Sequence, residues 1–318
     1  MPLFSFAFFL VAALFTVALT PLSIRLAYPL GAIDLPDGFR KRHSGAIPRL
    51  CGLAIYFAVF FVFIFFFLPE KQWAALLSGG AIIAALGISD DIFSLSPWPK
   101  LLAEGAAASL PFFLGLAPTR FTLGEYAFSL PPTLSLLFTV FWVMTLTNAF
   151  NMIDGLNGLA ATQTLLSALS LGLFASSIPA FAIAGAAFGF LPYNQKKPKA
   201  FLGDGGALFF GYALGVLSLG TEGTFSLFIP FLFLVPLWDV ASVVVLRLWQ
   251  KRNPFLADSS HLHHRLCQKG FDAWLVVCLL ALLSLGGVAG YLLLSYTPLP
   301  PFATILFLIL WFFCLLFI

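Results

Sequence analysis

The chain has 318 residues, of which 61% are hydrophobic and only 9% are charged, and 39 of them are Phe. Soluble domains carry roughly 25% charged residues, and a single buried core cannot hide this many apolar side chains, so most of them must face lipid. The composition excludes a water-soluble globular enzyme, disorder, collagen and a coiled coil. It predicts an all-α polytopic membrane protein.

Eleven apolar runs are long enough to cross a bilayer, which takes about 20 residues, or somewhat fewer in a short or tilted helix. They cover 3–24, 50–68, 72–88, 100–117, 132–151, 158–176, 178–193, 205–220, 224–246, 273–295 and 299–318. The first run has neither a positively charged start nor a cleavage site, so we expect a retained span rather than a signal peptide. The four cysteines suggest no disulfide framework. We expect one integral-membrane domain over 1–318.

Basic residues gather on one side of this topology. The loops after the odd-numbered spans hold 14 of the 16 Lys and Arg, and only Lys71 and Arg120 fall opposite. By the positive-inside rule that side is cytoplasmic, which places the N-terminus outside and the C-terminus inside. The same side holds all nine Asp and all four His, which the rule does not explain. We therefore predict a cytoplasmic active site, built from the loops 25–49, 89–100, 152–158, 194–204 and 247–272.

Acidic and amide residues recur at the ends of the spans. Asp90 and Asp91 end the third span, where adjacent carboxylates repel unless a proton or a hard divalent cation lies between them; a solvated helix end is the alternative. Asn148, Asn151 and Asp154 follow one another at three-residue spacing, which places neighbours on one helix face. Amides are costly at membrane depth, so these residues indicate a site, with helix packing by the Asn residues as the alternative.

Three further ionisable residues lie in or beside other spans. Asp204 stands among glycines that let backbone amides approach an anion, without a Walker or Rossmann pattern; a bare turn is the alternative. Asp239 lies inside the ninth span, where an ionisable group is a functional-site hypothesis by default. Lys100 begins the fourth span and either joins the site or extends to the membrane interface.

The last cytoplasmic loop combines imidazoles with guanidinium groups. His261, His263 and His264 follow Arg247, and a helix here would place His261 and His264 on one face. Both side-chain types suit phosphate oxygens. Zinc binding together with Cys267, or contact with anionic lipid head groups, are the alternatives.

Taken in order, five segments resemble the polyprenyl-phosphate N-acetylhexosamine-1-phosphate transferase family, a glycosyltransferase family 4 type. They are DLPDGFRKRHSGAIPR (34–49), DDIFSLSPWPK (90–100), NAFNMIDGLNG (148–158), FLGDGG (201–206) and the stretch 236–265 with PLWD and HLHHR. The resemblance implies that undecaprenyl phosphate attacks the β-phosphorus of a UDP-sugar and releases UMP. It also implies a requirement for Mg²⁺, with Mn²⁺ as an alternative, and a place in the bacterial cytoplasmic membrane.

Roles for single residues follow from the same resemblance. It makes Asp90, Asp91 and Asp154 catalytic, and Asp204 with Asp91 metal-binding. The substrate-binding set that it implies comprises Arg49, Lys100, Asn148, Asn151, Asn157, Asn194, Arg247, His261, His263 and His264. For Asp90 we rank positioning above proton removal, because a phosphate monoester with a second pKa of about 6 is already ionised at neutral pH.

Some positions depart from the family pattern. Asn157 stands where bacterial members usually have a second Asp, which puts that position in doubt as a metal ligand, and Cys51, Ala207 and Glu104 replace Gly, Ser and Gln. No core group is lost. The HLHH form and the modest length favour transfer of N-acetylglucosamine-1-phosphate, as in the initiators of O-antigen and teichoic acid synthesis. Another UDP-N-acetyl-sugar, or UDP-MurNAc-pentapeptide, is the alternative donor.

Two other function classes deserve comparison with an enzyme. A transporter needs polar residues on both sides of the membrane, whereas here they lie on one side. A protein that merely binds lipid phosphate needs no acidic metal site. We therefore expect a transferase whose partners are the bilayer, undecaprenyl phosphate and a UDP-sugar, with no nucleic acid; a homodimer is left open.

Overall fold

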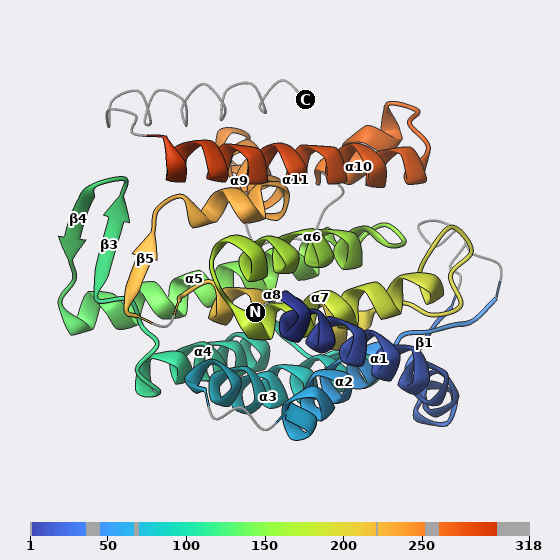
Figure 1. The fold of residues 1–318 in the computed structure, drawn as a ribbon. Coiled ribbons are helices and arrows are strands. Elements are labelled where there is room, and N and C mark those ends of the chain that lie inside the picture. Colours follow the sequence, from blue (N-terminus) through green and yellow to red (C-terminus); the bar gives the residue numbers. More distant parts are fainter. Residues whose placement is uncertain (1, 36–44, 67–69, 221, 252–260, 298–318) are drawn as a thin grey trace.

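A computed structural model describes residues 2–35, 45–66, 70–220, 222–251 and 261–297. Most of these residues are helical, and the helices run roughly alongside one another in a bundle (Figure 1). The helices are α1 (Pro2–Leu30), α2 (Cys51–Phe66), α3 (Lys71–Phe93), α4 (Pro97–Phe113), α5 (Pro132–Ile153), α6 (Leu159–Phe174), α7 (Ile178–Phe190), α8 (Gly203–Leu217), α9 (Leu234–Trp249), α10 (Leu262–Gln268) and α11 (Ala273–Tyr296), with short 3-10 helices at Leu191–Tyr193 and Ile229–Phe233.

Five described stretches are long and apolar enough to cross a membrane: Ser5–Leu30, Lys71–Phe93, Pro132–Ile153, Ile229–Trp249 and Ala273–Tyr296. Shorter apolar helices accompany them at Cys51–Phe66, Leu159–Phe174, Ile178–Tyr193 and Gly203–Leu217. Large apolar side chains such as Leu137 and Phe141 are exposed on the bundle, as lipid-facing positions should be. The chain is therefore a largely helical, polytopic membrane protein. The predicted span 299–318 lies outside the described residues.

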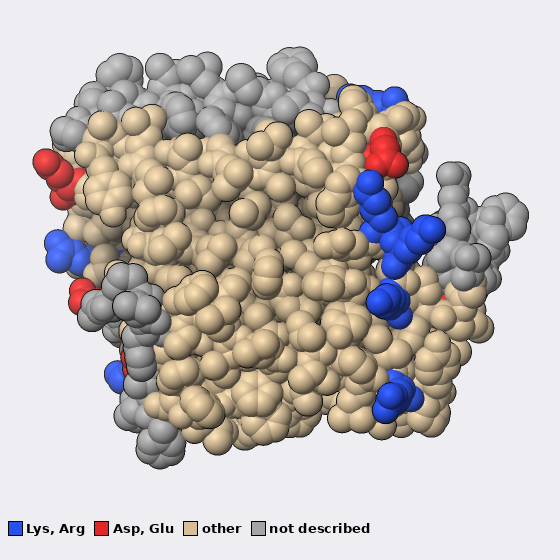
Figure 2. All heavy atoms as spheres, turned by 45° about the vertical axis from the view of Figure 1, so that its right-hand side comes forward, with Lys and Arg blue, Asp and Glu red and all other residues tan. Residues whose placement is uncertain are grey.

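The outer surface divides by charge. Figure 2 shows a broad central band without charged side chains; most of the Lys and Arg in view gather at one edge of the molecule, and a few charged side chains lie at the opposite edge. The edge with most of the Lys and Arg is the end of the bundle at which β1 lies in Figure 1. Such a band is what a lipid-embedded surface requires.

Helix α8 forms the centre of the bundle. Every residue from Gly205 to Leu217 is buried, and the helix packs against α2, α3 and α5. Glycines permit the closest crossing, because a Cβ on Gly87 of α3 would stand 2.4 Å from the Cα of Gly205, and one on Gly52 of α2 would stand 2.3 Å from its carbonyl carbon. Small residues let membrane helices approach in this way. The crossing brings the start of α8 against the end of α3.

Short strands are the main departure from the all-α prediction. Strands β1 (Ile33–Asp34) and β2 (Ile47–Pro48) pair antiparallel at one end of the bundle. At the other end β3 (Arg120–Leu123) lies between antiparallel β4 (Tyr126–Ser129) and parallel β5 (Thr224–Ser226) (Figure 1).

One predicted span is wrong in its first five residues. We predicted a span from 224, but β5 covers Thr224–Ser226, and the helical stretch that can cross a membrane begins with the 3-10 helix at Ile229 and continues as α9 from Leu234. The backbone carbonyl of Gly223, which has a positive φ of 66°, accepts hydrogen bonds from the N–H groups of Thr119 and Arg120. These bonds tie the segment to β3, so it extends as a strand instead of joining the helix.

Candidate functional site

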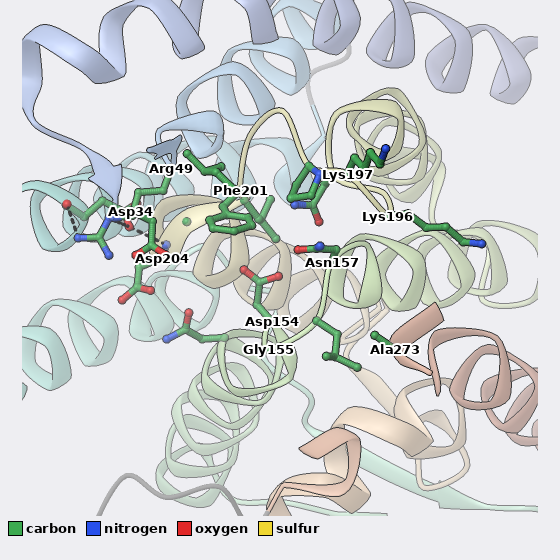
Figure 3. A pocket seen from close by; sticks show the side chains of 18 residues that line it. Asp34, Arg49, Asp154, Gly155, Asn157, Lys196, Lys197, Phe201, Asp204 and Ala273 are labelled. Atoms are coloured by element: carbon green, nitrogen blue, oxygen red, sulfur yellow. Dashed lines mark hydrogen bonds and ion pairs between the residues drawn. The ribbon is translucent and has the colours of Figure 1, made fainter. Parts of the chain in front are cut away.

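A cavity of about 920 Å³ opens at the end of the bundle where β1 lies. The β1–β2 segment, the ends of α3 and α5, the loop before α8 and the starts of α8 and α11 contribute to its wall. Figure 3 shows Asp154 and Asn157 between Asp204 on one side and Lys196 on the other. The polar side chains that line the cavity are those of Asp34, Arg49, Asp91, Asn151, Asp154, Asn157, Asn194, Lys196, Lys197 and Asp204.

Asp91 holds the N-terminus of α8. Its Oδ1 accepts the backbone N–H of Asp204 at 3.1 Å and its Oδ2 accepts that of Gly205 at 3.2 Å. The first N–H groups of a helix have no partner within the helix, and here a carboxylate from another helix supplies one. Arg49 donates from Nη2 to the backbone carbonyl of Asp91 at 2.7 Å, and its Nε lies 3.7 Å from Asp91 Oδ1. Asp91 thus fixes Asp204 relative to α3.

Lys100 connects Asp90 with Asp204. Its Nζ is hydrogen-bonded to Asp90 Oδ2 and lies 3.5 Å from Asp204 Oδ2. The other oxygen of Asp90 accepts the backbone N–H of Leu95 at 2.6 Å. Neither Asp90 nor Lys100 lines the cavity, whereas the side chain of Asp204 lines it and is 35% exposed. Asp204 is therefore the member of this group that can meet a ligand.

Asp154 follows the last residue of α5 and lies in the middle of the cavity. Burial raises the pKa of Asp154 well above its ordinary value, and the neighbouring carboxylates of Asp204 and Asp91 raise it further. Within the described parts of the chain no group donates a hydrogen bond to its carboxyl group. A proton or a cation is needed to stabilise this concentration of negative charge.

Asn194 joins two loops of the cavity wall. Its Oδ1 accepts the backbone N–H of Gly158 at 2.7 Å, and its Nδ2 donates to the carbonyl of Ala200 at 2.9 Å. Gly158 has a φ of 77°, which a residue without a Cβ adopts at no steric cost. We predicted Asn194 to bind substrate, and it lines the cavity; both ends of its amide group are hydrogen-bonded to the backbone, which holds the loops together.

Asn148 and Arg247, two predicted substrate-binding residues, lie away from the cavity lining. Asn148 Nδ2 donates to Glu104 Oε2 at 2.6 Å, which links α5 to α4 inside the bundle. Arg247 is buried in the last turn of α9. Asn151, three residues after Asn148, does line the cavity, as does Asp154. Of the three residues at three-residue spacing, two therefore reach the site and Asn148 does not.

The predicted histidines pack behind the cavity rather than lining it. Asp239 accepts from the backbone N–H of Leu262 at 2.5 Å and lies 2.7 Å from His261 Nδ1, so this buried carboxylate fixes the start of α10. His263 is 1% exposed, and neither ring nitrogen has a hydrogen-bond partner among the described residues. Its Nε2 faces Gly155, where an added Cβ would stand only 2.1 Å away.

Burial determines the protonation of His263 and His264. Burial and, to a smaller extent, neighbouring His264 together lower the pKa of His263 to about 3. The pKa of His264 is lowered as well, again mainly by burial. In the part of the chain that the structure describes, no three His, Cys, Asp or Glu side chains are grouped closely enough to hold a metal. The zinc alternative with Cys267 therefore has no support there.

Sequence reasoning missed several residues of the cavity wall. Asp34 and Phe201 line it, and both stand in segments that carried the family resemblance. Lys196 and Lys197 line it too, although their charge was used only to assign the cytoplasmic side. Their position in the sequence could have indicated this, because Lys196 and Lys197 stand in the loop just before the FLGDGG segment that contains Asp204.

Fold and site together define an integral membrane protein with an acidic cavity at one end of its helix bundle. The model of glycosyl transferase family 4 matches residues 73–222. A probable undecaprenyl-phosphate N-acetylglucosaminyl 1-phosphate transferase of Bacillus subtilis is 34% identical over 83% of this chain and 77% of the relative. The chain therefore belongs to glycosyl transferase family 4.

Two other relatives have similar coverage. A decaprenyl-phosphate N-acetylglucosaminephosphotransferase of Mycobacterium leprae is 32% identical over 86% of this chain and 79% of the relative. An undecaprenyl-phosphate alpha-N-acetylglucosaminyl 1-phosphate transferase of Escherichia coli is 27% identical over 87% of this chain and 82% of the relative. The similarity thus extends over most of each chain, and the relatives differ in the lipid that their names state.

Proposed function

We propose that this protein transfers N-acetylglucosamine-1-phosphate from its UDP-sugar to undecaprenyl phosphate and releases UMP. The observation that carries the proposal is that Asp204 and Asp154, from motifs far apart in the sequence, meet in one cavity beside the N-terminus of α8. All three relatives described above are named as transferases of N-acetylglucosamine phosphate to a polyprenyl phosphate. Another UDP-N-acetyl-sugar, or UDP-MurNAc-pentapeptide, is the alternative donor.

The reaction exchanges one phosphoanhydride bond for another. An oxygen of the lipid phosphate forms a bond to the β-phosphorus of the donor, and the bond from that phosphorus to the bridging oxygen breaks. UMP leaves with the bridging oxygen, so no proton has to be removed when the lipid phosphate is already ionised. Catalysis then consists mainly of positioning and charge stabilisation. In this arrangement Asp90 acts on Lys100, and through it on Asp204, rather than as a base.

We propose Mg²⁺ as the cofactor, with Asp204 as its protein ligand and the oxygens of Asn151 and Asp154 as further donors. Carboxylate and amide oxygens suit this hard cation. Although no three acidic side chains are preassembled among the described residues, Mg²⁺ commonly uses one or two carboxylates together with substrate phosphates. Mg²⁺ would supply positive charge to the phosphate oxygens on which negative charge develops. Asp91 is less suited as a ligand, because the N–H groups of α8 occupy both of its oxygens.

The charges of the cavity support a required cation. Four carboxylates line it, from Asp34, Asp91, Asp154 and Asp204, against three basic side chains, from Arg49, Lys196 and Lys197. When all four carboxylates are ionised, the excess of negative charge disfavours two anionic substrates; a divalent cation would favour the ionised form of Asp154 and Asp204 and reverse the balance. A transporter is disfavoured because the cavity opens at one end of the bundle, while the other end carries the sheet of β3, β4 and β5.

We also propose the topology: one domain over 1–318 with eleven spans, the N-terminus outside and the C-terminus inside. The cavity then faces the cytoplasm of a bacterial cell. The clustering of Lys and Arg at the cavity end supports this orientation through the positive-inside rule.

The test is release of UMP by the purified protein supplied with undecaprenyl phosphate, Mg²⁺ and single UDP-sugars, with EDTA as a control. We expect release with UDP-N-acetylglucosamine and none in EDTA. Asp204→Asn should abolish it, whereas Glu222→Gln, an exposed carboxylate near β5, should leave it unchanged. A folded wild-type sample that releases no UMP from any donor would refute the proposal.

A further inference from the structure

The loop 194–200 presents two lysines at the rim of the cavity. Its ends are held together, because the backbone N–H groups of Lys199 and Ala200 donate to the carbonyl of Tyr193 at 2.8 and 3.2 Å. Lys196 and Lys197, at the tip, line the cavity and are exposed. These hydrogen bonds close the base of the loop, from which the two lysines extend.

Lys196 is further fixed by an aromatic ring from the other end of the sequence. Its Nζ lies 5.7 Å from the centroid of Trp274, within the range of a cation–π interaction. Trp274 is itself anchored, because its backbone N–H donates at 2.9 Å to Asp272, the N-cap of α11. The same ring lies beside Gly158, at 4.0 Å from the place of an added Cβ. The ammonium group thus lies over a half-buried ring next to a cavity loop.

Among the described basic side chains of the cavity wall, those of the two lysines have no carboxylate partner. Arg49 is engaged by Asp91. Neither Lys196 nor Lys197 forms an ion pair with a carboxylate of the described residues. Figure 3 shows both lysines across Asn157 from Asp204, at the outer part of the cavity wall, whereas Arg49 lies on the side of Asp34 and Asp204.

We infer that Lys196, held on Trp274, binds a phosphate group of the UDP-sugar. The inference rests on the proposed function. The donor is water-soluble and has to enter across the exposed rim, where these lysines lie, whereas the phosphate of a lipid acceptor stays tethered to the membrane. An oriented ammonium group loses less entropy on binding than a free lysine side chain.

The test compares Lys196→Met with Lys199→Met, a matched variant in the same loop whose side chain is exposed and does not line the cavity. We expect Lys196→Met to raise the KM for the UDP-sugar about fivefold, or ~1 kcal/mol, with kcat and the KM for undecaprenyl phosphate within about twofold of wild type. Lys199→Met should change none of these. Lys196→Arg should keep most of the affinity, because guanidinium also stacks on Trp.

The role of Trp274 is tested by combining substitutions of Trp274 and Lys196 in one variant. Trp274→Leu should raise the same KM, and adding Lys196→Met to it should cost little more, because both changes remove one interaction. Fully additive effects would overturn the coupling. An equal effect of Lys199→Met, or a rise in the KM for the lipid instead of the donor, would overturn the assignment of Lys196 to the UDP-sugar.

A measurement of UDP binding distinguishes a failure of this inference from a failure of the proposed function. UDP binding to the detergent-solubilised protein, measured by calorimetry, needs no turnover. If wild type binds UDP and Lys196→Met binds it several-fold more weakly, the inference stands even where no UMP is released. Equal binding by both proteins would refute it while leaving the transferase proposal intact.

Discussion

The contact between Gly155 and His263 predicts a strong effect of a single methyl group. In Gly155→Ala the new Cβ would lie 2.1 Å from His263 Nε2, whereas ordinary contact begins near 3.4 Å, so loop and ring must separate by about 1.3 Å. The ring cannot retreat easily, because it is buried and lies against His264 at a centroid distance of 4.2 Å. Overpacking of this kind costs about 1–3 kcal/mol. The loop, which begins with Asp154, should move instead.

The expected loss of turnover is large because Asp154 is the residue next to Gly155. A displacement of about 1 Å at a reacting centre can cost roughly 10²-fold in rate. We therefore expect Gly155→Ala to lower kcat by about 10- to 100-fold in the UMP-release assay, with a smaller effect on the KM for the UDP-sugar. Gly105→Ala is the matched control, since Gly105 lies in helix α4 and an added Cβ there meets only Met144 Sδ at 4.0 Å.

Removal of the His263 ring tests whether its contact with the new methyl group causes the loss of turnover. His263→Ala opens the space that the methyl group needs, so Gly155→Ala combined with His263→Ala should be no less active than His263→Ala alone. Two results would refute the reasoning: wild-type kcat in Gly155→Ala, or a double variant in which the two losses simply add. The first would show that the loop is not held by the ring, and the second that the ring is not what the methyl group meets.

Three further predictions separate stability from chemistry. Asp204→Asn should leave thermal unfolding in detergent close to that of wild type while UMP release is lost, because its carboxyl group is partly exposed and the attraction of Lys100 is opposed by the nearby carboxylates of Asp90 and Asp91; a large fall in Tm would contradict this. Asp91→Asn should lower the free energy of unfolding by about 1–3 kcal/mol, since an amide can accept only one of the two N–H groups at the start of α8; an unchanged Tm would exclude that capping role. The pKa of His263 is lowered to about 3, so below about pH 6.5 the unfolded chain binds a proton that the folded chain does not. The free energy of unfolding should therefore fall as the pH drops, by at most ~1.4 kcal/mol per pH unit. Because the raised pKa of Asp154 acts in the opposite direction, the measured quantity is the difference in Tm between wild type and His263→Gln from pH 4 to 7, and a constant difference would refute the assignment.

The helical membrane fold could be predicted because its signal is local. Apolar runs such as 72–88 and 273–295 have the length that a bilayer demands, and α3 and α11 coincide with them within a few residues. Strands β3 and β5 could not be predicted in the same way. Their pairing joins Arg120 to Thr224 across about a hundred residues, and hydropathy alone does not distinguish a strand from the start of a helix.

The composition of the cavity was partly predictable for a different reason. Asp154, Asn157 and Asp204 are polar residues beside apolar runs, and such residues are rare unless they pair or serve a site. The same rule cannot tell a cavity-lining residue from a structural one. It drew equal attention to Asp239, which fixes α10, and to Asn148, which binds Glu104.

The adjacent pair Asp90 and Asp91 shows why this distinction needs three dimensions. Two neighbouring carboxylates suggested a shared proton or cation, yet successive residues of a helix point about 100° apart. Asp90 turns to Lys100 on α4, while Asp91 turns to the first N–H groups of α8 and to Arg49. Each carboxylate thus has its own partners, although the negative charges of Asp90 and Asp91 still repel each other. The pair then links α3 to two helices at once, which places Asp204, the carboxylate left partly exposed, at the wall of the cavity.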